Sequence, residues 1–470
     1  MTVTIAEPVA GRQFSARGTR WALAITSLAL FMTTLDNLVV TMALPAIRRS
    51  LHASIQSLEW TVNAYTLTFA VLLLTGAALG DRFGRRRMFV IGLAVFTAAS
   101  AAAALSPDTA MLIAARAVQG AGAAIVLPLT LTLLSEATPP QGRGMALGIW
   151  SGVSGLGVAI GPLAGGAVVQ GLDWHWIFWI NVPVGVALLP LARKRLAESR
   201  GPSRRLDIPG LALAGAGLLG VTYAVIRGQD LGWTSDGILV PMAAGVAALA
   251  AFAWWEAKSD APMLPMRFFR SRAFSAANAV SLAMYFGVFG SIFLLAQFLQ
   301  TAQGYSPLAA GLRTLPWTAM PILVAPFAGM LSDRIGSRPL LAAGLALQAT
   351  AIAWLAVILS PTVSYPLLVI PFALAGTGMA LVFAPAANTV LASVAPAEAG
   401  QASGATNAIR EFGGVLGVAV LASVFSAHGS YATPSSFAAG LTAALPVGAA
   451  FLAAGAVIAL LVPRPSREHE

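Results

Sequence analysis

The 470-residue chain contains no cysteine, only four histidines and few charged residues. The absence of cysteine excludes disulfides, thiolate metal sites and cysteine nucleophiles, and four dispersed histidines do not suggest a zinc site. Charged residues make up 10% of the chain, whereas a soluble domain has about 25%. Because 57% of the residues are hydrophobic, the chain has too little polar surface for a soluble protein, and we expect a membrane protein.

The net charge of +10 raises the possibility of nucleic-acid binding, but the distribution of the basic residues argues against it. They form short clusters between apolar runs, which is typical of the cytoplasmic loops of membrane proteins. The first long apolar run contains Asp36 and has no small-residue cleavage site. We therefore interpret it as a retained helix and not as a signal peptide.

Apolar runs of about 20 residues, the length that spans a bilayer, recur along the whole chain. Polar, charged or Pro/Gly-rich stretches separate fourteen of them. The predicted spans are residues 21–45, 57–80, 88–106, 109–136, 143–169, 174–193, 208–227, 237–256, 273–298, 306–332, 338–360, 364–391, 400–426 and 436–462.

An even number of spans places both termini on one side of the membrane, and the basic residues indicate which side. If the N-terminus is cytoplasmic, 22 of the 28 basic residues fall in cytoplasmic segments, and only Arg48, Arg49, Arg227 and Arg313 fall in outer loops. Such a bias predicts cytoplasmic termini. We expect a multi-pass protein of the cytoplasmic membrane.

The stretch "GDRFGRRRMF" at residues 80–89 has a weaker echo in "GMLSDRIGSRPL" at 329–340. An echo at corresponding places is typical of transporters built from repeats. We therefore expect two six-helix bundles with two additional helices between them. The predicted parts are a cytoplasmic segment 1–20, a first bundle 21–193, a linker 194–207, two additional helices 208–256, a basic connection 257–272, a second bundle 273–462 and a tail 463–470.

Four motifs follow one another in the first half of the chain. They are D-R-x-G-R-[KR] at Asp81, Arg82, Gly84, Arg85 and Arg86; R-x-x-Q-G-x-G-A-A from Arg116 through Gln119, Gly120 and Gly122; G-x-x-x-G-P-x-x-G-G at Gly157, Gly161, Pro162, Gly165 and Gly166; and "LDNLVVTMALP" from Leu35 to Pro45.

With these motifs the chain resembles the fourteen-helix drug:proton antiporter branch of the major facilitator superfamily. The resemblance covers nearly the whole chain and implies an all-α major facilitator fold that exports compounds in exchange for protons. Three positions depart from the family pattern, because Ala77 replaces a glycine and Leu38 and Thr41 replace a threonine and an asparagine. Hydrogen bonding at the end of the first helix is expected to differ accordingly.

The charges of the loop at residues 81–87 have two interpretations. They anchor a short cytoplasmic turn, or they also form a conformational gate with Glu136, Asp333 and Arg334. For the gate we expect Asp81 to face the positive N-terminus of a helix in the other half and Arg85 to reach Glu136. The resemblance implies the same gate.

Charged residues inside a span are rare and indicate function by default. Asp36 and Arg116 lie at similar depths in their helices, so we expect them to pair, either for proton coupling or as a structural ion pair. Arg410 and Glu411 lie near the middle of 400–426. A charged carboxylate at the bilayer centre costs about 2.5–3.5 kcal/mol, which favours proton binding, so Glu411 is our main candidate proton carrier; a fixed structural pair is the alternative. We expect Glu59 to be a solvated charge at a helix rim.

Gly157, Gly161 and Gly165 share one helix face, which allows close helix packing, and Pro162 removes a backbone hydrogen bond. Ordinary packing is one interpretation, and a tight, bendable interface between the bundles is the other.

A substrate pocket needs aromatic surface with a few polar groups. Its candidates, which otherwise only pack or form an interfacial belt, are Trp60, Asn63, Tyr65, Tyr285, Phe286, Phe289 and Gln297.

The sequence therefore predicts a secondary transporter that exports amphipathic, cationic or aromatic compounds against an inward flow of protons. A single-metabolite exporter is the alternative. No phosphate-binding loop and no catalytic motif is present, so neither an ATP-driven pump nor an enzyme is expected. We expect no catalytic residues, no metal, no cofactor besides the coupling proton and no nucleic-acid partner; the partners are the small substrate and the bilayer, and the protein is expected to be a monomer.

Overall fold

The computed structural model describes residues 16–139, 143–200, 207–395 and 398–463. All elements of these residues are helices. The first group comprises α1 (Ala16–Leu51), α2 (Ile55–Phe83), α3 (Arg85–Ala104), α4 (Thr109–Ala137), α5 (Arg143–Gly171), α6 (Trp176–Trp179) and α7 (Asn181–Arg195).

The remaining helices follow the 194–207 segment. They are α8 (Ile208–Leu231), α9 (Asp236–Lys258), the 3-10 helix η2 (Met266–Arg270), α10 (Arg272–Thr301), α11 (Pro307–Thr318), α12 (Met320–Ile335), α13 (Ser337–Ile358), α14 (Tyr365–Ala392), α15 (Ala399–His428) and α16 (Pro434–Ala459).

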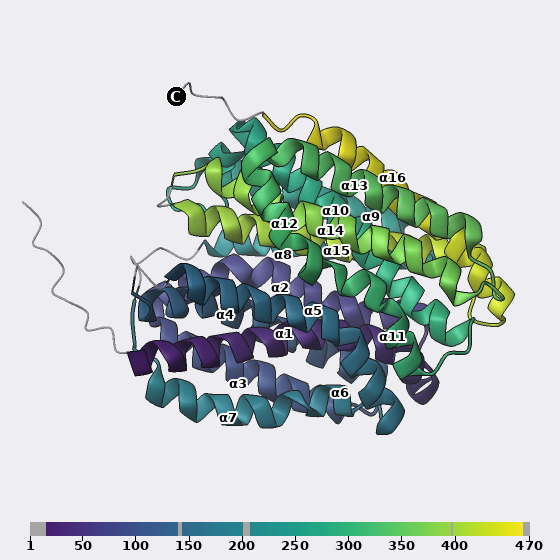
Figure 1. Cartoon of the computed structure of the whole chain (residues 1–470), viewed down its shortest axis with the longest axis horizontal. Helices are drawn as coiled ribbons and strands as arrows, with labels where there is room; N and C mark the ends of the chain where they lie inside the picture. Colours follow the sequence, from purple (N-terminus) through teal and green to yellow (C-terminus); the bar gives the residue numbers. More distant parts are fainter. Residues whose placement is uncertain (1–15, 140–142, 201–206, 396–397, 464–470) are drawn as a thin grey trace, which may run out of the picture.

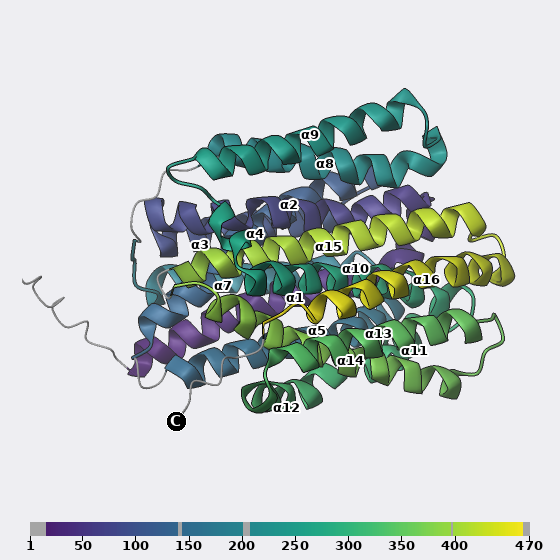
Figure 2. The same cartoon turned by 90° about the horizontal axis from the view of Figure 1, so that it is seen from above.

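The helices form two groups that lie side by side. In Figure 1, α1 to α7 occupy the lower part and most of α10 to α16 the upper part, while α11 lies lower, beside α5. Figure 2 shows the α8–α9 pair along one edge of the molecule, where α8 contacts α2 and α15. Most of α9 faces outward, and Trp254, for example, is 59% exposed. An apolar helix surface of this kind is suited to lipid contact.

Each predicted span coincides with one helix or with two consecutive helices. Residues 174–193 form α6 and α7, and residues 306–332 form α11 and α12. Pro321 explains the second break, because it has no N–H to donate to the carbonyl group of Trp317. Twelve helices of the described residues are long and apolar enough to span a membrane, or thirteen if α2, bent by 51° between Leu73 and Thr75, is one span. The protein is therefore a multi-pass membrane protein with twelve or thirteen candidate spans.

The glycines of the two D-R-x-G stretches both have a positive φ. Gly84 joins α2 to α3 with a φ of 109°, and Gly336 joins α12 to α13 with a φ of 82°. These values lie in the region that residues with a Cβ rarely adopt. The echo in the sequence thus corresponds to the same glycine-dependent turn between two helices in each half.

The two groups of helices separate at one end of the bundle and touch at the other. We call the end where α2 finishes and α8 begins the Asp81 end, and the end where α1 finishes and α2 begins the Arg48 end. At the Arg48 end the guanidinium of Arg48 lies 4.2 Å from the centre of the Tyr431 ring, and Gln300 Nε2 donates to the carbonyl oxygen of Met42 at 3.0 Å. A cavity lies between the groups, and its lining extends to Asp81.

Candidate functional site

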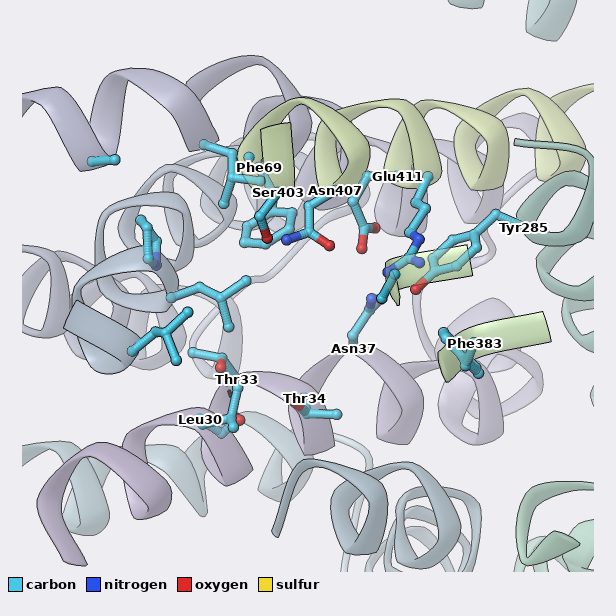
Figure 3. Close-up of a pocket in the computed structure, with 18 of the residues that line it drawn as sticks. Leu30, Thr33, Thr34, Asn37, Phe69, Tyr285, Phe383, Ser403, Asn407 and Glu411 are labelled. Atoms are coloured by element: carbon cyan, nitrogen blue, oxygen red, sulfur yellow. Dashed lines mark hydrogen bonds between the residues drawn. The ribbon is translucent and has the colours of Figure 1, made fainter. Parts of the chain in front are cut away.

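The cavity between the two groups of helices has a volume of about 1400 Å³. Figure 3 shows side chains of α15 directed toward side chains of α1 across this space, with aromatic rings from other helices beside them. Its lining includes Thr33, Thr34 and Asn37 of α1, Phe69 of α2, Tyr285 of α10, Phe383 of α14, and Ser403, Asn407 and Glu411 of α15.

Arg410 and Glu411 lie in the wall of this cavity, as neighbours on α15. The Arg410 guanidinium lies 6.0 Å from the centre of the Tyr285 ring and 5.8 Å from that of Phe383, within the range of a cation–π interaction. Its Nε and Nη2 atoms are buried without a hydrogen-bond partner in the described part of the chain. The cavity wall therefore combines a carboxyl group with a cation that has donors to spare.

Asp36 and Arg116 meet as predicted, in a buried network outside the cavity lining. Arg116 Nη1 donates to Asp36 Oδ2 at 2.5 Å, and both side chains are fully buried. Gln119 Nε2 and Asn181 Nδ2 donate to Asp36 Oδ1 at 2.9 and 2.7 Å. Both amides also donate to the hydroxyl oxygen of Ser100.

This network satisfies the Asp36 carboxylate with three donors, so the charge is stabilised where it lies. Arg116 Nε in addition donates to the carbonyl oxygen of Thr61 at 3.2 Å, and the Tyr65 ring covers the guanidinium at 4.3 Å. The sequence reasoning missed Asn181 and Ser100. The available signal was an amide or hydroxyl group within an apolar run, but nothing local connects those groups to Asp36.

The structure divides the predicted pocket residues. Tyr65, Tyr285 and Phe289 line the cavity. Trp60 instead packs on Val225 and Ile226 of α8, and Phe286 stacks on Phe451 with ring centres 3.9 Å apart. Neighbouring residues on a helix point about 100° apart, which is why Tyr285 faces the cavity and Phe286 does not.

Three further polar residues lie away from the cavity lining. Gln297 is buried, where it donates to the carbonyl oxygen of Phe293 and accepts from the Tyr431 hydroxyl. Asn63 is also buried, and neither atom of its amide has a partner in the described residues. The expectation for Glu59 was wrong, because this residue is only 1% exposed and not solvated. The start of α2 is covered by α8, which the periodicity of α2 does not reveal.

The predicted loop charges form a compact cluster at the Asp81 end. Arg85 donates to Asp81 Oδ1 from Nη2 at 2.7 Å and from Nε at 2.9 Å, and its Nη1 donates to Glu136. Glu136 also accepts from the Ser199 hydroxyl. The structure thus brings Arg85 and Glu136 together.

The position expected for Asp81 differs. Instead of facing a helix N-terminus of the other half, Asp81 pairs with Arg85, four residues further on, and borders the cavity. The cavity extends to this end between residues of both groups, such as Asp81 and Gln401, and the charge that pairs with Asp81 comes from its own half.

Glu198, the only acidic residue between positions 193 and 206, binds the turn after α2. Its carboxylate accepts from the backbone N–H groups of Arg86 and Arg87 at 3.0 and 3.2 Å. Its Oε2 atom also lies 3.6 Å from the Arg86 side chain. The sequence reasoning missed this residue, although an acid within a basic linker is a usable signal.

Of the corresponding charges in the second half, Arg334 is exposed on α12, and the side chain of Asp333 lies outside the described part of the chain.

The glycines of α5 face two different neighbours. Added Cβ atoms at Gly157, Gly161 and Gly165 would lie 3.3, 2.7 and 2.9 Å from atoms of α1, so this face packs within the first group. The other group is contacted by Gly166, where a Cβ would lie 2.3 Å from the carbonyl oxygen of Pro307. The expectation that the three-glycine face lies between the bundles is therefore corrected.

Pro162 and the end of α5 complete the contact with α11. A Cβ at Gly311 would lie 2.4 Å from the carbonyl oxygen of Pro162, and Gln170 accepts from the N–H of Leu308 at 3.3 Å. Small residues on both helices therefore allow backbone-to-backbone contact between the two groups near the Arg48 end.

Comparisons with known proteins agree with this architecture. The model of the Major Facilitator Superfamily matches residues 26–418 and, in a second match, 277–470. The chain is 38% identical over 407 residues to "Multidrug resistance protein Stp" of Mycobacterium tuberculosis (strain CDC 1551 / Oshkosh), with 86% of this chain and 75% of that protein covered. It is 37% identical over 467 residues to "Cephamycin export protein CmcT" of Amycolatopsis lactamdurans, with 97% and 95% covered.

The fold is also similar to solved structures. The crystal structure of the POT family transporter PepTSo superposes with a TM-score of 0.72 at 14% identity, with 95% of this chain and 98% of that chain covered. At this identity the similarity concerns the fold alone. The two matches to the family model extend over most of the sequence, and the chain belongs to the Major Facilitator Superfamily of membrane transporters.

Proposed function

We propose that the protein exports amphipathic compounds, cationic or aromatic, by alternating access and in exchange for protons. The observation that carries the proposal is the cavity of about 1400 Å³, in which the rings of Tyr285, Phe289 and Phe383 lie in the same wall as the carboxyl group of Glu411. A pocket with broad aromatic surface and few polar groups suits a varied set of apolar cations. The relative named as a multidrug resistance protein supports the same function.

A second candidate is an exporter dedicated to one compound. The relative named as a cephamycin export protein, which aligns over 97% of this chain, supports it. The two functions differ in the range of substrates and not in the fold, so the cavity is compatible with both.

Growth tests separate the two candidates. The full-length protein would be expressed in a bacterial host that lacks its own efflux pumps, and susceptibility would be measured against a panel of unrelated cationic and neutral drugs. We expect resistance to several unrelated cations that disappears when the proton gradient is collapsed. Resistance to a single compound would favour the dedicated exporter, and no resistance to any member of a wide panel would contradict drug export.

We further propose that the Asp81 end is cytoplasmic and that α5 is the fourteenth span. The distribution of arginines supports the orientation, and the 29-residue length of α5, with its contacts to α1 and α11, supports a span. Both termini are then cytoplasmic, and the proposed organisation is two six-helix bundles, 21–193 and 273–462, with 208–256 as two additional helices.

Single cysteines test this topology, because the natural chain has none. Pro107→Cys and Asp260→Cys place a thiol at exposed positions of opposite ends. A membrane-impermeant maleimide added to intact cells should label the first variant and not the second. Labelling of Asp260→Cys alone would reverse the proposed orientation.

We propose that the Asp81 cluster is a conformational gate. In this arrangement Asp81 is held by Arg85, and when the Asp81 end closes, its carboxylate becomes available to the positive N-terminus of a helix in the second half. Asp81→Asn keeps all four arginines of the turn, so insertion should be preserved while transport by proteoliposomes falls. Arg87→Gln, which alters an exposed neighbour in the same turn, should transport normally. A wild-type rate for Asp81→Asn would leave the loop as an anchor only.

A further inference from the structure

Two carboxyl groups meet at the Asp81 end of the α8–α9 pair, apart from the residues considered so far. Asp207 caps the N-terminus of α8, and Glu256 lies in the last turn of α9. Glu256 is only 2% exposed. Carboxyl groups are rarely buried without a counter-charge, so the surroundings of this pair need an explanation.

One oxygen of each carboxyl group accepts hydrogen bonds from the protein. Asp207 Oδ1 accepts from the N–H of Gly210 at 2.9 Å and from the Trp255 indole at 2.7 Å. Glu256 Oε2 accepts from the N–H of Leu264 at 3.0 Å. These bonds connect the start of α8, the end of α9 and the 259–265 connection that follows α9.

The other two oxygens face one another. Asp207 Oδ2 and Glu256 Oε1 are buried, and neither has a donor among the described residues. A Cβ atom added at Gly210 would lie 2.7 Å from each of them, so both oxygens border the same small space. Because a carboxylate oxygen can only accept, a hydrogen bond between these two side chains requires a proton on one of them.

The charged groups on neighbouring elements have other partners. Asp81 pairs with Arg85, Arg267 pairs with Glu398, and the Lys258 ammonium lies 4.4 Å from the Trp254 ring. The other charged residues near this end are Arg82, Asp260, Arg270 and Arg272, which are exposed, while Arg204 and Arg205, which precede Asp207, lie outside the described residues. In the part of the chain that the structure describes, no basic nitrogen forms an ion pair with Asp207 or Glu256. Repulsion between two adjacent carboxylates then favours the binding of one proton.

We propose that Asp207 and Glu256 bind a single proton between Oδ2 and Oε1, and that this proton fastens the α8–α9 pair to the 259–265 connection. The connection borders the cavity through Ala261, Pro262 and Met263. When the proton leaves to water, the pair changes from one negative charge to two, and repulsion separates the carboxylates. Glu256 then releases the N–H of Leu264, and the connection at the mouth of the cavity becomes free to move.

A spin label on the connection tests the proposal without any transport assay. Ala261→Cys introduces the only thiol in the full-length protein, and a nitroxide attached there would be followed by electron paramagnetic resonance in lipid nanodiscs. We expect an immobile spectrum at low pH that shifts to a mobile one as the pH rises over the range from about 5 to 9, where coupled carboxyl pairs can release a shared proton.

Two substitutions in the labelled protein isolate the proton. Glu256→Gln supplies a permanent N–H donor to Asp207 and should keep the label immobile at every pH. Glu256→Ala removes the contacts of the Glu256 carboxyl group with Asp207 and Leu264 and should make the label mobile at every pH. A label whose mobility does not change with pH, or changes identically in Glu256→Gln, would overturn the proposal. Mobilisation by EDTA at low pH would assign a metal ion to the pair in place of the proton and would equally overturn it.

Discussion

Two pairs of charged residues lie in the membrane part of the protein, and their surroundings differ. The Asp36 carboxylate accepts three hydrogen bonds from Arg116, Gln119 and Asn181 in a closed, buried network. Glu411 borders a cavity, beside an arginine with two unused donor atoms. The Asp36 carboxylate is satisfied by its donors, although Arg116 Nη2 has no partner in the described residues, and a buried network of this kind is costly to break. A carboxyl group at a cavity, in contrast, is accessible to protons and to a cationic substrate. The same residue types therefore suit a structural role in one place and a coupling role in the other.

Tyr65 lies between the Asp36–Arg116 network and the cavity. Its ring lies 4.3 Å from the Arg116 guanidinium and also lines the cavity. A substrate in the cavity would thus touch the covering of the buried network and not the ion pair itself. Substitutions at Glu411, Arg116, Arg410 and Asn181 test the proposed division of roles.

Replacing Glu411 is expected to abolish proton-coupled export. Glu411→Gln resembles the protonated acid and removes the group that binds and releases the proton. Substrate-induced proton release from the purified protein in weak buffer should disappear, while substrate exchange across a membrane without a proton gradient should continue.

The matched control for Glu411 is Asn407→Ala, which changes a cavity residue one turn away on the same helix face. This variant should bind substrate less tightly and still release protons. If Glu411→Gln releases as many protons as the wild-type protein, Glu411 is not the proton carrier, and Asp36 becomes the first candidate for that role.

Removing the arginine of the closed network should cost stability. Arg116→Ala leaves the Asp36 charge buried without its ion-pair partner, and breaking a buried pair in this way costs about 3–5 kcal/mol. Arg116→Lys should restore only part of this, because one ammonium cannot donate in the directions of Asp36, Gln119 and Thr61 at once. Unfolding in detergent, followed by circular dichroism, measures both changes.

The comparison predicts a different outcome for Arg410→Ala. Because Nε and Nη2 of Arg410 have no partner in the described residues, its removal breaks few interactions and should alter stability much less than Arg116→Ala. Equal losses of stability in the two variants would show that the two arginines are not used differently.

A smaller effect is expected at Asn181. Asn181→Ala removes one of the three donors to Asp36 and should destabilise the protein by about 1.5–3 kcal/mol, the range for a hydrogen bond to a charged group. Asn278→Ala provides the comparison, since Asn278 is equally buried but, among the described residues, donates only to the neutral carbonyl group of Phe274. An identical cost in both variants would mean that Asn181 does not act through the Asp36 charge.

Much of the architecture was predictable because it depends on local properties of the sequence. Long apolar runs mark helices, and a helix or a helix pair occupies each predicted range. The helical repeat also places polar residues at comparable depths, which is why the pairing of Asp36 with Arg116 was correct. The breaks at Ala319 and Ile180 were not predicted, although Pro321 was a local signal for the first.

The direction of individual side chains was less predictable. Tyr285 and Phe286 are adjacent aromatic residues with the same polarity in the sequence, yet one lines the cavity and the other stacks on Phe451. Likewise, an acid at the start of a helix looks solvated, but the neighbouring helices bury Glu59. Which face of a helix is covered depends on neighbours that are far away in the chain.

The sequence by itself determined the membrane environment, the helical elements, the glycine turns at Gly84 and Gly336, and the scarcity of charge that makes each buried ion informative. Only the tertiary structure decided which of these ions are satisfied. Asn181 reaches Asp36 across 145 positions of the sequence, and Trp255 reaches Asp207 across 48. Hydropathy and helical periodicity are summed over neighbouring residues, whereas the hydrogen bonds that stabilise a buried charge come from whichever helices pack beside it.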